Sequence, residues 1–415
     1  MKTRYQILII GGGTAGIMVS SSLLKKNPKL HIGIIEPSES HRYQPAWTLV
    51  GGGTYNYKKT LRPMKTVIPK RADWIKEEVV SIDGKNNTVT ISNGRHITYE
   101  FLVIAPGLKL APSLTEGLDE SLDKGVVCSN YTDPNHTWQV IKNFKGGVAL
   151  FIQPPKPYKC GGAPQKVMYL ADDHFKKRGI KKNTSVVFAS ASDIIFSVKK
   201  IADTLWKVVN RKGINVKFEH ELKKVDGKNK IAWFKVAPDF VEHNPTQLQV
   251  LEENGLVGIK YDMLHVVPIN IPPDFIGKSN LADENGWVNI DSKTLQHKQF
   301  SNIFSLGDAS NLPTSKTGAA IRKQAPVVVN NILLLIKTKE LGNKVYDGYT
   351  SCPFITGYGK MALAEFDYDK NFMPDPKLKR MFIKDSSKEH WRLWILKKYI
   401  LPYLYWNKML KGKEV

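Results

Sequence analysis

Cysteine is scarce in this chain of 415 residues, which contains only Cys128, Cys160 and Cys352. A small secreted scaffold held by disulfides needs more cysteines, so we expect any bridge between these three to serve redox chemistry. Long apolar runs are also missing, and no stretch reaches the roughly 18 to 20 residues of a bilayer-spanning helix. Residues 1–4 lead straight into an apolar strand, so we expect neither a cleavable signal peptide nor a transit peptide.

Acidic side chains are in short supply as well. The chain has 61 Lys and Arg against 38 Asp and Glu, which gives a formal net charge of +23 and a pI near 9.6. This excess favours an anionic partner, such as a membrane surface or a small anion. No motif of a nucleic-acid-binding fold accompanies the charge, so we expect no nucleic acid partner. The hydrophobic content of 42% fits a folded enzyme and excludes a disordered chain.

The clearest motif is a glycine fingerprint close to the N-terminus, between a buried-strand pattern at residues 6–10 and a predicted helix. It consists of Gly11, Gly12, Gly13, Thr14, Ala15 and Gly16. The next predicted strand, residues 31–35, is followed by Glu36. The glycines permit a tight turn and a close approach of a pyrophosphate to the helix N-terminus, and the acid accepts from a ribose hydroxyl. Because an acid disfavours a 2′-phosphate here, the motif predicts FAD or NAD rather than NADP.

Two later segments favour FAD over NAD. Residues 99–104 form a buried-strand pattern followed by a small-residue turn that ends at Gly107. Residues 302–306 form another, which is followed by Gly307 and Asp308. Both resemble the strand ends that close over FAD in flavoproteins with two dinucleotide-binding domains. In those proteins the aspartate accepts a hydrogen bond from the ribityl chain of the flavin.

The middle of the chain keeps the strand pattern of a second doubly wound domain but lacks a second glycine fingerprint. Residues 149–152 and 185–189 read as its strands. A nicotinamide-binding protein needs a fingerprint after the first of them, where this chain has residues 153–160, ending in Cys160. The helix expected from about Gln165 would place Cys160 near its N-terminus, where the helix dipole stabilises a thiolate.

We therefore predict an α/β fold with two Rossmann-like dinucleotide-binding domains, as in glutathione-reductase-like flavoproteins. Residues 1–112 and 290–340 would form a discontinuous FAD-binding domain, and residues 113–289 a second domain without an NAD(P)H site. In residues 341–415, aromatic residues and leucines mix with lysines on both sides of Pro402, and we expect this proline to break the run. This pattern predicts two amphipathic membrane-binding helices, with packing against the protein's own core as the alternative.

Longer stretches resemble one family over nearly the whole chain. They are residues 36–51, 159–170, 261–266, 308–317 and 346–353, and they include the sequences around Cys160 and Cys352. The chain resembles the sulfide:quinone oxidoreductases, in the branch that includes the mitochondrial enzyme and similar bacterial ones. The resemblance implies an FAD-dependent enzyme that oxidises hydrogen sulfide to sulfane sulfur and passes two electrons to a membrane quinone.

The resemblance also implies which residues form the site. Cys160 and Cys352 would be the catalytic pair, bridged directly or through a sulfane sulfur in the resting enzyme. Because Cys160 is the better leaving thiol, we expect it to face the flavin, but which cysteine sulfide attacks first stays open. The expected cofactor-binding residues are Gly11, Gly13, Thr14, Ala15, Gly16, Glu36, Gln44, Val79, Gly107, Gly307, Asp308, Gly318, Ala319, Ala320 and Ile321. We expect no metal, and we interpret Cys128 as a buried packing residue, with a flavin-linked role as the alternative.

The implied partners are hydrogen sulfide, ubiquinone or menaquinone, and a small sulfur acceptor such as sulfite, a thiol or polysulfide. The enzyme would be peripheral (monotopic) on the cell membrane, on a face that the sequence does not fix, and a homo-oligomer is left open. Two other functions fit parts of the pattern: a type II NADH:quinone dehydrogenase, and a non-catalytic persulfide carrier or sulfide sensor. The missing second fingerprint argues against the first, and turnover with a soluble quinone analogue would exclude the second.

Overall fold

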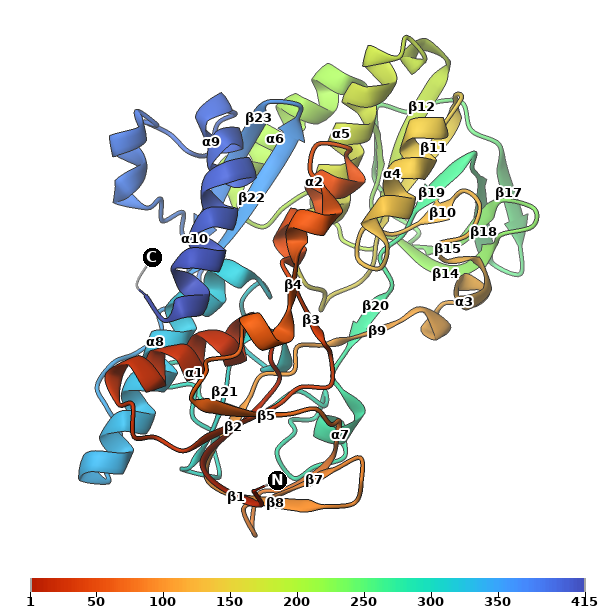
Figure 1. Ribbon diagram of the computed structural model, residues 1–415. Helices are drawn as coiled ribbons and strands as arrows, with labels where there is room; N and C mark the ends of the chain where they lie inside the picture. Colours follow the sequence, from red (N-terminus) through yellow and green to blue (C-terminus); the bar gives the residue numbers. More distant parts are fainter. Residues whose placement is uncertain (1, 414–415) are drawn as a thin grey trace.

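A computed structural model describes residues 2–413 and shows two α/β units joined by two crossing strands, with a C-terminal segment packed against both (Figure 1). The first sheet has the order β5-β2-β1-β8-β7-β6. Strand β21 also pairs with β8, along residues 102–104, whereas β7 pairs with residues 96–98. Its strands are β1 Arg4–Ile10, β2 Ile32–Ile35, β5 Ala72–Ile75, β6 Val79–Asp83, β7 Thr88–Ile91, β8 His96–Ile104 and β21 Ile303–Ser305. Strands β5, β2, β1, β8 and β21 are parallel, so their carboxyl ends share one edge.

Helices α1 (Thr14–Lys26) and α8 (Gly318–Thr338) pack against each other beside this sheet. The inner residues of β1 are buried on both faces, as expected for a strand between two parallel neighbours. Among the described residues only α8 has the length and hydropathy of a membrane-spanning helix, but half of its apolar stretch is buried in the protein. Its buried side chains belong to the core of the first unit, which explains its apolar sequence without a membrane.

The second sheet has the order β10-β19-β11-β12-β13-β16 and is flanked by helices α4, α5 and α6. Its elements are β10 Val127–Cys128, β11 Gly147–Gln153, β12 Thr184–Ser190, β13 Asn215–Lys217, β16 Glu242–His243, β19 Met263–His265, α4 Pro134–Asn143, α5 Ala163–Lys177 and α6 Lys199–Lys212. A four-stranded antiparallel sheet follows, with β14 His220–Asp226, β15 Ile231–Val236, β17 Val250–Glu253 and β18 Leu256–Lys260. Together the two mostly parallel sheets confirm the predicted α/β class.

Three two-stranded ribbons and five short α-helices complete the strands and α-helices of the described residues, beside several single turns of 3-10 helix. The ribbons are β3 Ser40–Arg42 with β4 Leu61–Pro63, β9 Lys109–Ala111 with β20 Ile269–Ile271, and β22 Thr350–Gly357 with β23 Lys360–Phe366. The short helices are α2 Trp47–Gly51, α3 Leu118–Ser121, α7 Asp274–Gly277, α9 Trp391–Ile395 and α10 Leu401–Asn407.

We propose that the paired strands β9 and β20 mark the boundary between the two units. Ile276, Leu281 and Val288 pack in the core of the first unit, although the sequence pattern had assigned them to residues 113–289. The second crossing therefore falls near Ile271 rather than at residue 290. The predicted unit at residues 341–415 is not separate from the other two. Some of its buried residues join their cores, and others, such as Met361 and Leu393, form a small cluster with Leu49 and Leu170.

The C-terminal helical region differs from the prediction of two helices broken at Pro402. A π-helical turn, Leu396–Ile400, joins α9 directly to α10, and Pro402 lies in the first turn of α10, where its missing N–H is tolerated. One side of this run packs on the protein: Tyr405 and Leu410 are buried in the first core, and Leu410 O accepts a hydrogen bond from Ser21 Oγ on α1. The other side is exposed and carries Trp391, Ile395, Tyr399 and Tyr403.

This two-sided packing predicts unequal costs for alanine substitutions. Leu410 is 1% exposed, so Leu410→Ala should lower the free energy of unfolding by about 2–5 kcal/mol through lost burial and a residual cavity. Tyr403 is 59% exposed, so Tyr403→Ala should stay within about 0.5 kcal/mol of the wild type. Urea unfolding measures both, and equal stabilities would contradict the packing of this segment on α1.

Candidate active site

The segments singled out in the sequence meet at the carboxyl edge of the first sheet. The fingerprint follows β1, Gly107 follows β8, and Gly307 and Asp308 follow β21, and these three strands are neighbours in the sheet. A Cβ placed on Gly307 would lie 3.7 Å from the Cβ of Ala15 and 3.4 Å from Cδ1 of Ile321. The N-terminal ends of α1 and α8 therefore converge beside the end of β21. In α/β folds a ligand binds at this kind of edge.

The fingerprint has the shape of a phosphate cradle. Gly11 has φ +100°, and a Cβ there would collide with Ala105 O and lie 2.8 Å from Pro106 Cα, so only glycine fits. A Cβ on Gly13 would meet no atom within 4 Å, and no side chain caps α1. The first N–H groups of α1 therefore face open space, as a pyrophosphate requires. The residues present fit a dinucleotide.

Glu36 and Val79 lie at the far end of this cradle. Glu36 accepts hydrogen bonds from Gly12 N at 2.7 Å and from Ser38 N at 2.8 Å, one on each carboxylate oxygen. Each oxygen keeps a further lone pair for a hydroxyl group. The N–H of Glu36 bonds to Ile75 O, and Val79 opens β6 four residues after Ile75.

Gln44 and Asp308 lie at the end of the cradle nearer to the thiols. Lys159 Nζ donates to Gln44 Oε1 at 2.8 Å, and a Cβ on Gly318 would lie 3.8 Å from Pro45 Cγ. Burial raises the pKa of Asp308, and the cations of Lys159 and Lys316 oppose this shift. The residues Gly318, Ala319, Ala320 and Ile321 form the first turn of α8, whose cap is Thr317 Oγ1 accepting from Ala320 N.

Cys160 and Cys352 are brought together from positions far apart in the chain. Cys160 lies in the loop between β11 and α5, where its φ of +51° is unusual for a residue with a side chain. The loop is held by Cys160 N donating to Lys316 O at 3.0 Å and by Tyr131 OH donating to Lys159 O at 2.8 Å. Cys352 lies on β22, and the two free thiols are in hydrogen-bonding contact.

The two thiols have opposite acidities. The S–H of Cys352 donates to the sulfur of Cys160 and holds the pKa of Cys160 well below its usual range, with further help from the cations of Lys166 and Lys397. The same hydrogen bond and burial raise the pKa of Cys352. The pair therefore holds one thiolate, on Cys160, and one thiol, on Cys352. The sequence had correctly placed Cys160 before a helix, but it did not reveal these neighbouring side chains, which lower the pKa of Cys160.

Two buried lysines supply the positive potential around the thiols. Lys166, on α5, donates from Nζ to Cys160 Sγ at 3.3 Å, and the two sulfurs raise its pKa against the effect of burial. Lys397 reaches the pair from the π-helical turn, and burial together with Lys166 lowers its pKa to about 8. The sequence pattern placed Lys397 in a membrane-binding helix. Its proximity to Cys160 could not be predicted, because only the fold brings these two residues together.

Cys128 lies outside the thiol pair. It is fully buried on β10, and its S–H donates to Leu264 O at 3.4 Å. Burial raises its pKa strongly, and neither Cys160 nor Cys352 contributes to that shift. These surroundings are those of a packing residue.

A second feature that the sequence did not reveal joins the C-terminal helix to the fingerprint. Thr14 Oγ1 lies 2.7 Å from Tyr405 OH, which lies 2.6 Å from His41 Nε2. His41 Nδ1 lies 3.0 Å from Gly12 O. A neutral His41 satisfies all four groups if Thr14 donates to Tyr405, Tyr405 donates to Nε2, and Nδ1–H donates to Gly12 O.

Comparisons with known proteins agree with this geometry. Residues 5–140 match the family model described as pyridine nucleotide-disulphide oxidoreductase. The mitochondrial sulfide:quinone oxidoreductase of Dictyostelium discoideum is 43% identical over all of this chain and 87% of that protein. The mitochondrial enzyme of Mus musculus is 38% identical over 99% of this chain and 87% of its own length.

The chain belongs to the sulfide:quinone oxidoreductase family. Its fold also matches the crystal structure of the sulfide:quinone oxidoreductase from Aquifex aeolicus, with a TM-score of 0.77, 19% identity and coverage of 99% of this chain and 92% of that one. The predicted family and architecture are therefore confirmed, and the chain is a flavin-dependent oxidoreductase. The relatives support this family over the NADH dehydrogenase alternative.

The burial of His41 in this sulfide:quinone oxidoreductase predicts a loss of stability in acid. Burial lowers the pKa of His41 to about 4, while an unfolded histidine has a pKa of about 6.5. Since the folded state binds fewer protons, the stabilisation is complete above about pH 6.5 and is lost as the pH falls toward 4. The free energy of unfolding from urea titrations should fall between pH 7 and pH 4.5 by about 2–3 kcal/mol less in His41→Asn than in the wild type. Both proteins keep the contribution of other buried histidines, such as His265. His96→Asn, at an exposed position, should keep the wild-type decline; equal declines in all three proteins would contradict the assignment.

Proposed function

We propose that this protein oxidises hydrogen sulfide at Cys160 and Cys352 and passes two electrons through FAD to a membrane quinone. The observation that carries the proposal is the contact of a low-pKa thiolate with a buried thiol, beside the cradle at the ends of β1, β8 and β21. The names of the relatives state the same substrates, sulfide and quinone. A carrier or sensor without turnover would need neither this dithiol pair nor the cradle beside it.

FAD fits the cradle as follows. The N–H groups of Thr14, Ala15 and Gly16 in the first turn of α1 would hold the pyrophosphate, and the glycines Gly11 and Gly13 would let it approach closely. Glu36 would accept from the adenosine ribose, with Val79 nearby. Asp308, Gln44, Gly107, Gly307 and the turn of Gly318, Ala319, Ala320 and Ile321 would surround the ribityl chain and the ring. When bound, the flavin accepts two electrons from the thiols and gives them to quinone.

The thiol chemistry follows from the unequal acidities. In the oxidised protein a disulfide joins the two sulfurs, and hydrosulfide attacks the sulfur of Cys352, so that an S–S bond forms as the Cys160–Cys352 bond breaks. Cys160 leaves as the thiolate, since Lys166 and Lys397 stabilise its charge. An acceptor thiol, sulfite or polysulfide then takes the sulfane sulfur from Cys352. The two thiols re-form the disulfide and release two electrons, which reduce the quinone together with two protons.

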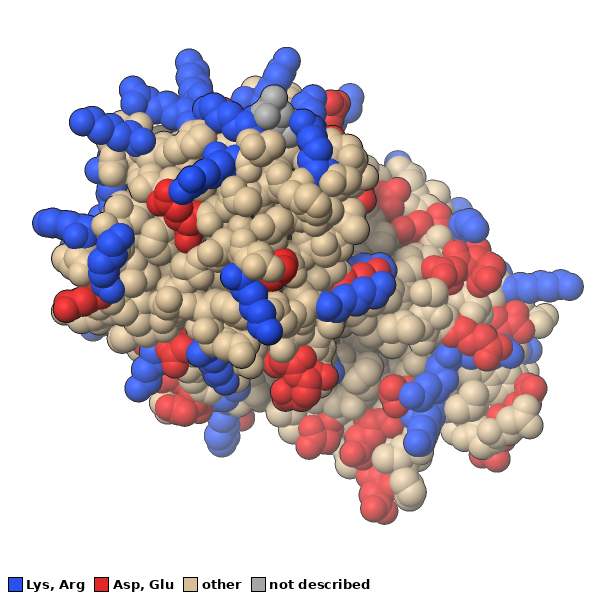
Figure 2. All heavy atoms as spheres, turned by 90° about the horizontal axis from the view of Figure 1, so that it is seen from below, with Lys and Arg blue, Asp and Glu red and all other residues tan. Residues whose placement is uncertain are grey.

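The C-terminal helical run suits the delivery of a lipid-soluble quinone. Its outer side exposes Trp391, Tyr399 and Tyr403 together with Ile395, and Phe382 is exposed nearby. Residues 376–413 contain eleven Lys or Arg and two Asp or Glu. Figure 2 views the opposite side, the first unit seen from below, and Lys and Arg side chains crowd the upper and left margins there too, with most Asp and Glu side chains lower and to the right. An aromatic side flanked by cations is typical of peripheral membrane attachment, here proposed for the cell membrane.

The catalytic pair is tested by serine variants of all three cysteines. Cys160→Ser and Cys352→Ser should each lower sulfide-dependent reduction of a short-chain quinone by on the order of a hundredfold or more, because each removes one sulfur of the disulfide. Cys128→Ser should keep most of the activity, since a hydroxyl can still donate to Leu264 O. Steady-state turnover with normalised flavin content measures all three. Near-normal turnover in either of the first two variants would overturn the mechanism.

The FAD assignment is tested at Asp308. Asp308→Ala should bind FAD roughly tenfold more weakly or worse, because the acceptor for the ribityl chain is lost. The ratio of flavin to protein absorbance after dialysis measures the loss. Asp239→Ala, at an exposed position in the second unit, is the matched control. Full flavin occupancy in Asp308→Ala would show that this aspartate does not hold the cofactor.

A further inference from the structure

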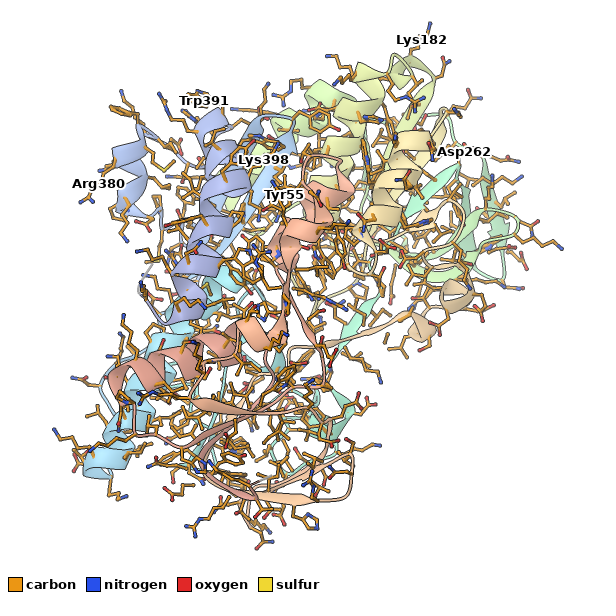
Figure 3. All side chains as sticks on the ribbon, viewed as in Figure 1. Tyr55, Lys182, Asp262, Arg380, Trp391 and Lys398 are labelled. Atoms are coloured by element: carbon orange, nitrogen blue, oxygen red, sulfur yellow. The ribbon has the colours of Figure 1, made fainter. Side chains whose placement is uncertain are left out.

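A cleft of about 720 Å³ opens between the C-terminal helical run and the segment that follows α2. One wall is formed by residues around β4, including Tyr55, Lys59 and Arg62, and the opposite wall includes Lys398 and Trp406. Figure 3 shows Tyr55 beside α2 and Lys398 on the C-terminal run, close to each other in this view. The cleft is separate from the thiol pair, because none of the cysteines or Lys166 lines it.

The lining of the cleft has charge of one sign only. It includes four cations, Lys59, Arg62, Lys398 and Lys411, and no Asp or Glu. Among the described residues none of the four forms an ion pair with a carboxylate; Arg62 instead stacks over the ring of Trp406 at 4.8 Å. Four cations in a lining without a carboxylate are suited to a phosphate group.

The position of the cleft indicates where the phosphate comes from. Tyr399 and Tyr403 line it and are also part of the exposed aromatic side of the helical run. A ligand in the cleft would therefore lie at the level where aromatic side chains meet lipid headgroups. A quinone ring is neutral and gains little from four cations, whereas an anionic phospholipid brings a phosphate to this depth.

We propose that this cleft binds the headgroup of an anionic phospholipid, with Lys59 and Lys398 on its opposite walls. The proposal rests on the proposed membrane attachment and adds to it a site with a defined ligand class. Lipid binding here is independent of the sulfide chemistry, since the residues of the cleft take no part in that reaction. The two can therefore fail separately.

The test compares binding of the full-length holoprotein to vesicles of phosphatidylcholine alone and with added phosphatidylglycerol. Lys59→Gln/Lys398→Gln should weaken binding to the anionic vesicles by roughly tenfold, because two cations at the headgroup are lost. Lys59→Arg/Lys398→Arg should restore the affinity. Lys176→Gln/Lys182→Gln removes the same charge from exposed positions on the second unit and should cost less than about twofold.

Three outcomes would overturn the proposal. The first is equal weakening in the cleft variant and the control variant, which would mean that only net charge counts. The second is saturable binding of soluble glycerol phosphate that is lost in the cleft variant while its binding to anionic vesicles is unchanged, which would assign the cleft to a free phosphate. The third is loss of short-chain quinone reduction in the cleft variant alone, which would make the cleft a quinone site. If the wild type itself lacks that activity, the proposed function fails and the vesicle comparison still stands.

Discussion

The hydrogen bond from the Cys352 thiol to the Cys160 thiolate is the contact on which the site depends. It requires a loop from the second unit and a strand from the C-terminal segment to meet, where Cys352 is buried and Cys160 is half-buried. A thiolate in such surroundings needs nearby positive charge, because desolvation alone favours the neutral thiol. Lys166 from α5 and Lys397 from the C-terminal run provide it. Three separate parts of the chain thus combine to hold one charge.

The C-terminal segment has more than one role in this arrangement. It carries Cys352, sends Lys397 inward to the thiols, and reaches the fingerprint through the hydrogen bond between Tyr405 and Thr14. Its outer side is exposed and aromatic. The π-helical turn explains how one helical run places Lys397 toward the thiols and aromatic side chains toward the surface. Its extra residue changes the direction of the side chains that follow it. The surface proposed for the membrane is therefore the back of an element that also completes the redox site.

The sequence was sufficient for the parts of the site that depend on local pattern. A glycine fingerprint between a strand and a helix is the pattern of a tight turn that binds a pyrophosphate, so its place at the end of β1 could be predicted. The strand ends at Gly107 and Gly307 could be predicted as well. The contacts of Lys397 and Tyr405 could not, because they join residues hundreds of positions apart and lie within an ordinary amphipathic pattern. The prediction of a break at Pro402 was wrong for a similar reason: proline is tolerated in a first helical turn, and only the neighbouring π-helical turn makes that position a first turn. The pairing of Cys160 with Cys352 came from resemblance, and no spacing rule would have supplied it.

The central claim is that Cys160 is the thiolate released beside the flavin when sulfide attacks Cys352. An anaerobic titration of the purified protein with sulfide, without quinone, follows this step directly in the flavin spectrum. In the wild type we expect a long-wavelength absorption band, typical of a thiolate beside oxidised flavin, together with loss of the oxidised flavin absorbance. In Cys160→Ser neither change should follow sulfide addition. A normal band and normal flavin reduction in Cys160→Ser would contradict the account.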